Sequence, residues 1–195
     1  MELPGRFVMQ EFEATTPMDH VAVVIVDIQE KLFEHIFNKE EILTNVSKVI
    51  SFCKRLGVPL FVTEQYPQGL GETLPALREL LASDYRPIPK TVFSCYGAPD
   101  FVHALDESEV ETVVLVGIET HICVMQTALS GLAYGAHDMI VLADCVGSRV
   151  DLNHGLGLDR MRDEGVIISS MEMFFYELLG EAKTAEHKLV FDLLK

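Results

Sequence analysis

Basic residues are scarce in this sequence, and their scarcity excludes a large group of partners. The 195 residues include 15 Lys and Arg against 30 Asp and Glu, which gives a formal net charge of −15. Nucleic acids and anionic membranes are bound mainly through clustered Lys and Arg. We therefore expect no nucleic-acid partner and no membrane partner.

Long apolar runs are also missing. The run at 21–26 (VAVVIV) is far shorter than the roughly 20 residues that span a bilayer. The N-terminal stretch MELPGRFVMQEFEATTP carries acids early and has no basic region followed by an apolar one, so no signal peptide is expected. These observations predict a cytoplasmic protein.

Cysteines are few and widely spaced. The four are Cys53, Cys95, Cys123 and Cys145, with no CxxC pair and no zinc-ligand spacing. A chain of this length can bury a core without disulfides, and reduced thiols are typical of the cytosol. We therefore expect free thiols.

Short apolar runs alternate with helix-like patterns along the whole chain. The apolar runs lie at 21–27, 58–63, 87–92, 112–117, 138–143 and 165–169. The helix-like patterns lie at 40–56, 73–82, 99–107, 121–134, 151–164, 171–179 and 183–194. Continuous apolar runs are typical of strands buried on both faces of a parallel sheet, and this alternation predicts a single α/β domain over 1–195 with a doubly wound sheet. Gly57 and Gly135 stand where helix C-caps are expected.

The alternation of apolar runs and helix-like segments does not fix the order of the strands in the sheet. A flavodoxin-like order and a Rossmann-like order are both compatible with it. The first apolar run ends in Asp27-Ile28-Gln29-Glu30 rather than in a glycine-rich phosphate loop. We therefore expect no nucleotide cofactor bound at that loop.

Ligands of open α/β sheets bind outside the carboxyl ends of the strands. The residues expected at that edge are Asp27, the segment 63–66, Lys90, the turn 118–123 and Asp144. Each has a structural alternative: Asp27 could cap a helix, Lys90 could be a surface lysine, and Asp144 could brace a loop.

Cys123 is the candidate nucleophile. Thr120 is a possible N-cap, which places Cys123 in the first helical turn, where N–H groups and the helix dipole favour a thiolate. His121 is only two positions away and does not face Cys123 on a helix. Asp27 is the better base, with Lys90 holding the negative charge in place. From Cys123 alone, a buried structural cysteine remains the alternative.

Several segments together resemble the isochorismatase-like cysteine hydrolases, which include nicotinamidases and N-carbamoylsarcosine amidase. They are VVIVDIQEKL (23–32), PKTVFSCYG (89–97), GIETHICVMQTALSGLAYG (117–135), ADCVGSR (143–149) and RMRDEGVIISSMEMFFYELLG (160–180). The resemblance runs over most of the chain and keeps the order Asp, Lys, Cys. It implies a three-layer sandwich with a six-stranded, mostly parallel sheet of the Rossmann-like kind.

The resemblance also implies a catalytic triad of Asp27, Lys90 and Cys123. It implies a cis peptide bond between Ile118 and Glu119, which directs the N–H of Glu119 toward the substrate. Together with the N–H of Cys123, this group forms an oxyanion hole. Asp27 then takes the thiol proton, the sulfur attacks a carbonyl carbon, and water releases the acid from the resulting thioester.

Two departures from the family narrow the expected substrate. Nicotinamidases bind a metal through an aspartate and histidines after the second strand, but here that position reads TEQYPQGLG, with Glu64 as its only anionic ligand. No metal and no other cofactor is therefore predicted, and nicotinamide is disfavoured. True isochorismatases lack the cysteine, so Cys123 disfavours isochorismate. The TEQYPQGLG form resembles the isochorismatase-domain-containing proteins, and Gln65 and Tyr66 are predicted to line the pocket.

These observations favour a hydrolase that cleaves a C–N bond in a small amide or a related carbonyl compound. One alternative is a regulatory or protein-interaction module that keeps the fold with little catalysis. Another is a redox sensor, which requires Cys95 or Cys145 close to Cys123. The family resemblance further implies a homo-oligomer.

Overall fold

The computed structural model describes residues 20–194. Its six strands form one sheet in the order β3-β2-β1-β4-β5-β6, and the five ladders between them are parallel. The predicted doubly wound α/β class is confirmed, and the strand order is the Rossmann-like one. The segment on which the signal-peptide prediction rests lies outside the described residues.

Each of the six predicted apolar runs overlaps a strand. The strands are β1 (Val21–Val26), β2 (Leu60–Gln65), β3 (Pro87–Lys90), β4 (Thr112–Ile118), β5 (Asp138–Gly147) and β6 (Ile167–Ser169). β2 begins later than predicted because the N–H of Val58 donates to the carbonyl of Cys53 and closes the turn after the preceding helix. β5 continues past its predicted end, so Asp144 and Cys145 lie inside a strand and not after it.

The helices follow the predicted patterns closely. They are α1 (Glu30–Phe33), α2 (Lys39–Leu56), α3 (Pro67–Leu70), α4 (Pro75–Leu81), α5 (Pro99–Asp106), α6 (Met125–Tyr134), α7 (Asp151–Asp163), α8 (Met171–Leu179) and α9 (Ala185–Leu194). The sequence did not predict α1 and α3, because four residues are too few for a helical period to repeat. Gly57 and Gly135 cap α2 and α6 in the left-handed conformation, at φ 75° and 78°, as predicted. None of the helices in the described part of the chain is long and apolar enough to cross a membrane.

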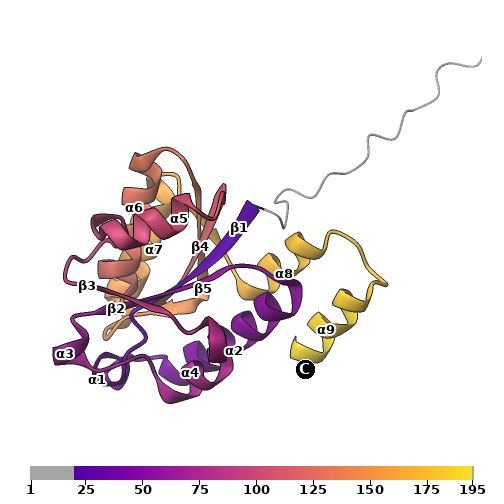
Figure 1. Cartoon of the computed structure of the whole chain (residues 1–195), viewed down its shortest axis with the longest axis horizontal. Helices are drawn as coiled ribbons and strands as arrows, with labels where there is room; N and C mark the ends of the chain where they lie inside the picture. The colour runs from indigo at the N-terminus through magenta and orange to yellow at the C-terminus, as the bar shows by residue number, and fades with distance from the viewer. Residues whose placement is uncertain (1–19, 195) are drawn as a thin grey trace, which may run out of the picture.

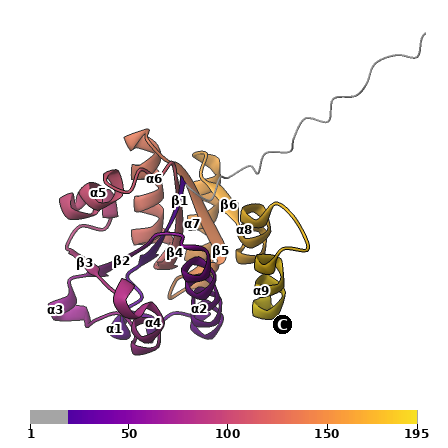
Figure 2. The same cartoon turned by 45° about the vertical axis from the view of Figure 1, so that its right-hand side comes forward.

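The helices cover both faces of the sheet and make a three-layer sandwich (Figure 1). On β1, Val21, Val23 and Ile25 face one hydrophobic cluster, which also holds the buried side chains of α2, α4, α8 and α9. Ala22, Val24 and Val26 face a second cluster, which is formed with α5, α6 and α7. This alternation follows from the two-residue period of a strand. Figure 2 shows α9 beside α8 at the side of the domain away from α5 and α6.

The central strands β1 and β4 approach each other closely at their carboxyl ends. Gly117 of β4 has φ 119°, and a Cβ placed there would lie 2.1 Å from the carbonyl oxygen of Val26. Only glycine tolerates both that conformation and that contact. After this point β1 leads toward α2 on one face and β4 leads toward α6 on the other. The crevice between two such strands is where doubly wound proteins bind their ligands.

Candidate active site

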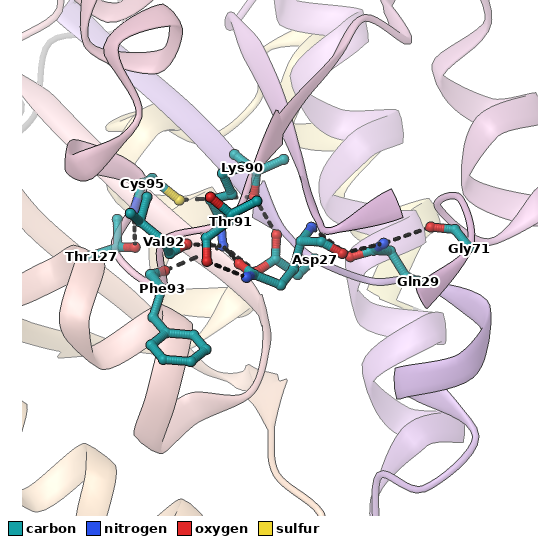
Figure 3. Close-up of polar contacts among 11 residues, drawn as sticks. Asp27, Gln29, Gly71, Lys90, Thr91, Val92, Phe93, Cys95 and Thr127 are labelled. Carbon is teal, nitrogen blue, oxygen red and sulfur yellow. Dashed lines mark hydrogen bonds and ion pairs between the residues drawn. The ribbon is translucent and has the colours of Figure 1, made fainter. Parts of the chain in front are cut away.

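Asp27 and Lys90 form a buried ion pair at the carboxyl edge of the sheet (Figure 3). Asp27 follows β1 with φ 51°, in the left-handed region that residues other than glycine seldom adopt. Lys90 is the last residue of β3. The Lys90 Nζ lies 2.6 Å from Oδ2 of Asp27, and both side chains are fully buried. The surface role considered for Lys90 and the helix-cap role considered for Asp27 are therefore both wrong.

Each member of the pair has further partners. The hydroxyl of Thr63 donates to Oδ1 of Asp27 at 2.8 Å. The Lys90 ammonium donates to Oε1 of Gln65 at 2.7 Å and makes longer contacts, 3.4 and 3.3 Å, with the carbonyls of Val92 and Phe93. An ammonium has three N–H bonds, and these partners are enough to use all of them. Lys90 is therefore arranged to neutralise Asp27.

The pKa of Lys90 reflects the same arrangement. Burial lowers this pKa, but the neighbouring Asp27 carboxylate, with smaller effects from Cys123 and Cys95, raises it above the ordinary value for a lysine. Lys90 is consequently charged throughout the physiological pH range.

Cys123 lies in a π-helical turn, Thr120–Val124, that connects β4 to α6. Burial raises the pKa of its thiol, the Asp27 carboxylate raises it further, and the positive charge of Lys90 acts in the opposite direction. The prediction that a helix N-terminus favours the Cys123 thiolate is therefore wrong for the resting protein. Loss of solvation and a nearby carboxylate outweigh the helix dipole, and the thiol keeps its proton.

Thr120 is not an N-cap, contrary to the prediction. Its hydroxyl pairs with Nδ1 of His154 at 2.9 Å, and α6 begins after Val124 without a side-chain cap. The preceding peptide bond, Ile118–Glu119, is cis.

The turn before Cys123 is tied to the segment that follows β5. Three consecutive side chains of the turn pair with that segment: Glu119 with the N–H and Nε of Arg149 at 2.9 and 3.0 Å, Thr120 with His154, and His121 with Ser148 at 2.9 Å. His121 bonds to Ser148, so it is not placed as a base for Cys123. The backbone that carries Glu119 and Cys123 is thus held by contacts with the segment that follows β5.

Tyr66 and Gln65, the two residues predicted to line a pocket, lie in different surroundings. A cavity of about 270 Å³ lies on the Lys90 side of the site, and Tyr66, Thr91, Val92 and Pro99 are among its lining residues. The amide of Gln65 is instead bonded within the buried network, where its Nε2 donates to the carbonyl of Thr91 at 2.9 Å.

Glu64, the candidate metal ligand, is bonded to other groups. Its Oε1 accepts hydrogen bonds from the N–H and hydroxyl of Thr73, at 2.7 and 2.9 Å, and from the Tyr85 hydroxyl at 2.7 Å. Across residues 20–194, no group of three or more His, Cys, Asp or Glu side chains is arranged to hold a metal ion. Glu64 therefore ties β2 to the chain around α4, which is a structural role.

Asp144 and the remaining cysteines are also placed by the structure. Oδ1 of Asp144 accepts the N–H of Met171 at 2.8 Å, at the start of α8, so the bracing role holds although Asp144 is not at a strand end. Cys145 packs in the hydrophobic cluster on the opposite face of the sheet from Cys123, whereas Cys95 shares the face of Cys123. The Cys95 thiol contacts the Thr63 hydroxyl at 3.8 Å, and its N–H donates to Thr127 Oγ1 at 2.9 Å.

The sequence reasoning missed two residues of this network, Thr63 as a partner of Asp27 and Gln29 as a partner of Gln65. Gln29 is fully buried, and its Oε1 accepts the N–H of Gln65 at 2.7 Å. Strand alternation could have indicated Thr63, because positions 63 and 65 of β2 point to the same side. No pattern in the sequence pointed to Gln29.

Comparison with known proteins identifies the family of this chain. The isochorismatase domain, as a family model, matches residues 21–173. The chain belongs to the isochorismatase family. This family membership confirms the resemblance inferred from the motifs, and together with the fold it supports a hydrolase.

Individual proteins of known sequence or structure are similar to this isochorismatase-family protein over most of its length. It is 36% identical over 167 residues to isochorismatase domain-containing protein 2 of Xenopus laevis, covering 85% of this chain and 79% of that protein. The structure of the MAR1 ribonuclease of Caenorhabditis elegans superposes with a TM-score of 0.83 at 35% identity and covers 91% of each chain. The YcaC protein of Escherichia coli, described as an octameric hydrolase of unknown specificity, has a TM-score of 0.83 at 22% identity, with 91% of this chain and 89% of that chain covered. At that identity the last likeness shows the fold alone.

Proposed function

We propose that this protein is a cysteine hydrolase that cleaves the C–N bond of a small amide, or a related carbonyl bond, through a thioester on Cys123. The observation that carries the proposal is the buried pair of Asp27 and Lys90 beside the Cys123 thiol. A carboxylate whose charge is balanced, next to a thiol that keeps its proton, is the arrangement that a general base and its nucleophile require.

The first half of the reaction follows from these positions. As the Cys123 sulfur attacks the carbonyl carbon, its proton passes to Asp27. Because the pKa of the thiol is raised, proton transfer accompanies the attack and a free thiolate does not precede it. Thr63 and Lys90 hold the two oxygens of the carboxylate during this step.

The negative oxygen that develops on the substrate needs donors other than Lys90, whose N–H bonds are used within the network. We assign this role to the backbone N–H groups of Glu119 and Cys123. Loss of one such donor typically lowers the rate ~10²–10³-fold. Asp27 then returns the proton to the leaving amine or ammonia, and the same carboxylate activates the water that hydrolyses the thioester.

The last two residues of β2 bear on the choice of substrate. Oε1 of Glu64 accepts three hydrogen bonds that tie β2 to the chain around α4, and the Gln65 amide is bonded to Lys90, so both side chains serve the structure around the site. We therefore propose substrate binding without a metal, and nicotinamide is disfavoured. The described cysteines are free, as in proteins of reducing compartments, and a cytoplasmic location and self-association are part of the proposal.

RNA is a substrate to test because the Caenorhabditis elegans relative is named a ribonuclease. The net charge of −15 opposes RNA binding, so we do not propose this activity. An RNA oligonucleotide in the substrate panel will decide the matter.

The test is a panel of small amides, ureides, esters and one RNA, assayed for release of ammonia, acid or cleaved RNA. Wild type should turn over at least one amide-like compound, and mass spectrometry should find an acyl group on Cys123. Cys123→Ala should be inactive, and Cys145→Ala should retain activity, because Cys145 is a buried thiol on the other face of the sheet. Full activity of Cys123→Ala on a substrate of the wild type would show that Cys123 is not the nucleophile. The absence of both turnover and acylation favours the inert regulatory module.

A further inference from the structure

The side chain of Gln29 lies beside the end of β2, where β1 no longer pairs with that strand. β1 pairs with β2 as far as Val26 and Thr63, and the N–H of Asp27 still donates to the carbonyl of Thr63 at 3.2 Å. The chain then turns away at Asp27. Beyond that point, Oε1 of Gln29 accepts the N–H of Gln65 at 2.7 Å, and Nε2 of Gln29 donates to the carbonyl of Gln65 at 3.0 Å. A side-chain amide thus makes the pairing that a neighbouring strand would otherwise provide.

Gln29 is itself held in one orientation. Its Nε2 also donates to the carbonyl of Gly71 at 2.6 Å, and its side chain is fully buried. Its acceptor atom and its two N–H bonds are therefore all used, and a flipped amide would place donors and acceptors wrongly. Figure 3 shows this network running from Gly71 through Gln29 toward Lys90 and Asp27.

The Gln65 amide is oriented just as strictly. Its Oε1 accepts from Lys90 Nζ at 2.7 Å, and its Nε2 donates to the carbonyl of Thr91 at 2.9 Å. Lysine can only donate and a carbonyl can only accept, so one orientation alone satisfies both partners. Gln65 thus supplies a neutral acceptor that orients the Lys90 ammonium without competing with the charge of Asp27.

We infer that Gln65 is a positioning residue that holds the Lys90 ammonium on Asp27, and that Gln29 positions Gln65 in turn. The consequence for catalysis rests on the proposed function, in which Asp27 is the base. The chain of contacts runs from Gln29 to Gln65, then to Lys90 and to Asp27, and it acts on the reaction only through Lys90. A carboxylate at position 65 would share the positive charge of Lys90 with Asp27. The charge of Lys90 would then lower the pKa of the Cys123 thiol less than it does in the wild type.

Two variants of position 65 test the inference, with one charge-matched control. Gln65→Glu adds a negative charge beside Lys90, and Gln65→Met removes the acceptor at similar size. Thr44→Glu adds the same charge at an exposed position of α2, whose buried side chains lie in the cluster on the other face of the sheet from Cys123. Alkylation of Cys123 by iodoacetamide, measured across pH by mass spectrometry of the Cys123 peptide, reports the surroundings of the thiol and needs no substrate.

The expected results separate positioning from a purely structural role. Gln65→Glu should alkylate about tenfold more slowly than wild type near pH 8, because the thiolate fraction falls tenfold for each unit of pKa increase. Both position-65 variants should lose about 10²-fold in kcat, the effect of a misplaced catalytic group, with KM changed much less. Thr44→Glu should stay within about twofold of wild type in both measurements, as expected for an exposed surface position.

Gln29→Glu tests the second step. Glutamate keeps an acceptor for the N–H of Gln65 but loses the donors to Gln65 and Gly71. It should lower kcat in the wild-type background and have little further effect in Gln65→Met, since residues that act through one path are not additive. Additive losses would show that Gln29 does not act through Gln65.

The inference is overturned if Gln65→Glu and Gln65→Met fold and match the wild type in both alkylation rate and kcat. Thermal unfolding checks that the variants are folded. If both variants fail to fold, NMR of the Lys90 ammonium in the wild type decides. The inference requires slow exchange of its three bonded protons, and exchange as fast as that of exposed lysines contradicts it. Should the wild type hydrolyse nothing in the panel, the proposed function fails, whereas the alkylation profiles still test the positioning of Lys90.

Discussion

The Nζ of Lys90 lies 2.6 Å from Oδ2 of Asp27, and neither side chain is exposed to solvent. The two residues are far apart in sequence and come from the ends of β3 and β1, which lie on either side of β2. A buried ion pair contributes little net stability, because loss of hydration offsets the attraction between the charges. Its presence at the carboxyl edge of the sheet fits the chemistry proposed for Cys123, and several measurements follow from it.

Replacement of Asp27 by asparagine should affect hydrolysis and thiol reactivity in opposite directions. Asp27→Asn removes the base, so hydrolysis should fall ~10²–10⁴-fold. The same change removes a charge that raises the pKa of Cys123 and leaves Lys90, which lowers it. Alkylation of Cys123 near pH 8 should therefore accelerate about tenfold or more. Slower alkylation in Asp27→Asn would show that Asp27 does not keep the thiol protonated, and Lys90→Met should slow alkylation as the opposite control.

The stability of the pair should depend on whether one charge or both are removed. Lys90→Met leaves a buried carboxylate without its counter-ion and should lower the free energy of unfolding by about 3–5 kcal/mol. The double variant Asp27→Asn with Lys90→Met should recover much of that loss, because neither side chain then carries a charge. Urea denaturation of the single and double variants measures the difference.

An exposed ion pair provides the control for that experiment. Arg162 and Asp159 lie 2.8 Å apart on α7 and are both largely exposed. Arg162→Met should cost less than about 1 kcal/mol, as is usual for surface pairs. A double variant at the buried pair that is no more stable than Lys90→Met alone would contradict the electrostatic explanation.

Two glycines with positive φ should differ sharply in their tolerance of alanine. Gly117→Ala places a Cβ against the backbone of Val26 and should destabilise the protein by more than about 4 kcal/mol, the range of exceptional core changes. Gly135 has φ 78° and no atom within 4 Å of its added Cβ, so Gly135→Ala should cost only about 1–2 kcal/mol. Equal losses in urea denaturation would mean that backbone conformation, and not the contact between β1 and β4, sets the requirement at Gly117.

Tyr85 should make stability depend on alkaline pH. Burial and the hydrogen bond to Glu64 raise its pKa from 10.0 to about 12. The folded state therefore favours the protonated phenol, and the resulting stabilisation is fully present below about pH 10 and is lost as pH rises toward about 12. The free energy of unfolding of the wild type relative to Tyr85→Phe should be constant below this pH window. Within the window it should fall, because only the wild type loses the stabilisation from the phenol. A constant difference up to about pH 12 would contradict the assigned hydrogen bond.

Much of the fold could be predicted because it depends on local pattern. Each apolar run overlaps a strand, and Gly57 and Gly135 end α2 and α6 in the left-handed conformation that glycine favours. Predicted boundaries differ from the structure where a longer-range contact decides, as in β5, which continues beyond Asp144 by pairing with β4. The short α1 and α3 carry no repeating pattern.

The candidate site also has features that the sequence predicted and features that it could not. The family motifs indicated Asp27, Lys90 and Cys123 by their types and order, and the comparisons confirm the family but leave the catalytic roles as proposals. The protonation of Cys123 could not be predicted, because it depends on burial and on a carboxylate nearly a hundred positions away in sequence. Thr120 looked like a cap because its position was right, but His154 is its actual partner.

The sequence by itself determined the elements and the kinds of side chain at the sheet edge, since these follow from strand period, helix period and glycine conformation. Only the tertiary structure decided which of these side chains meet. β1 and β3 are separated by β2, so the contacts of Lys90 with Asp27 and with Gln65 exist only once the strand order is set. Burial then changes the protonation of the groups brought together, because solvation and nearby charge are properties of position in space and not of position in the chain.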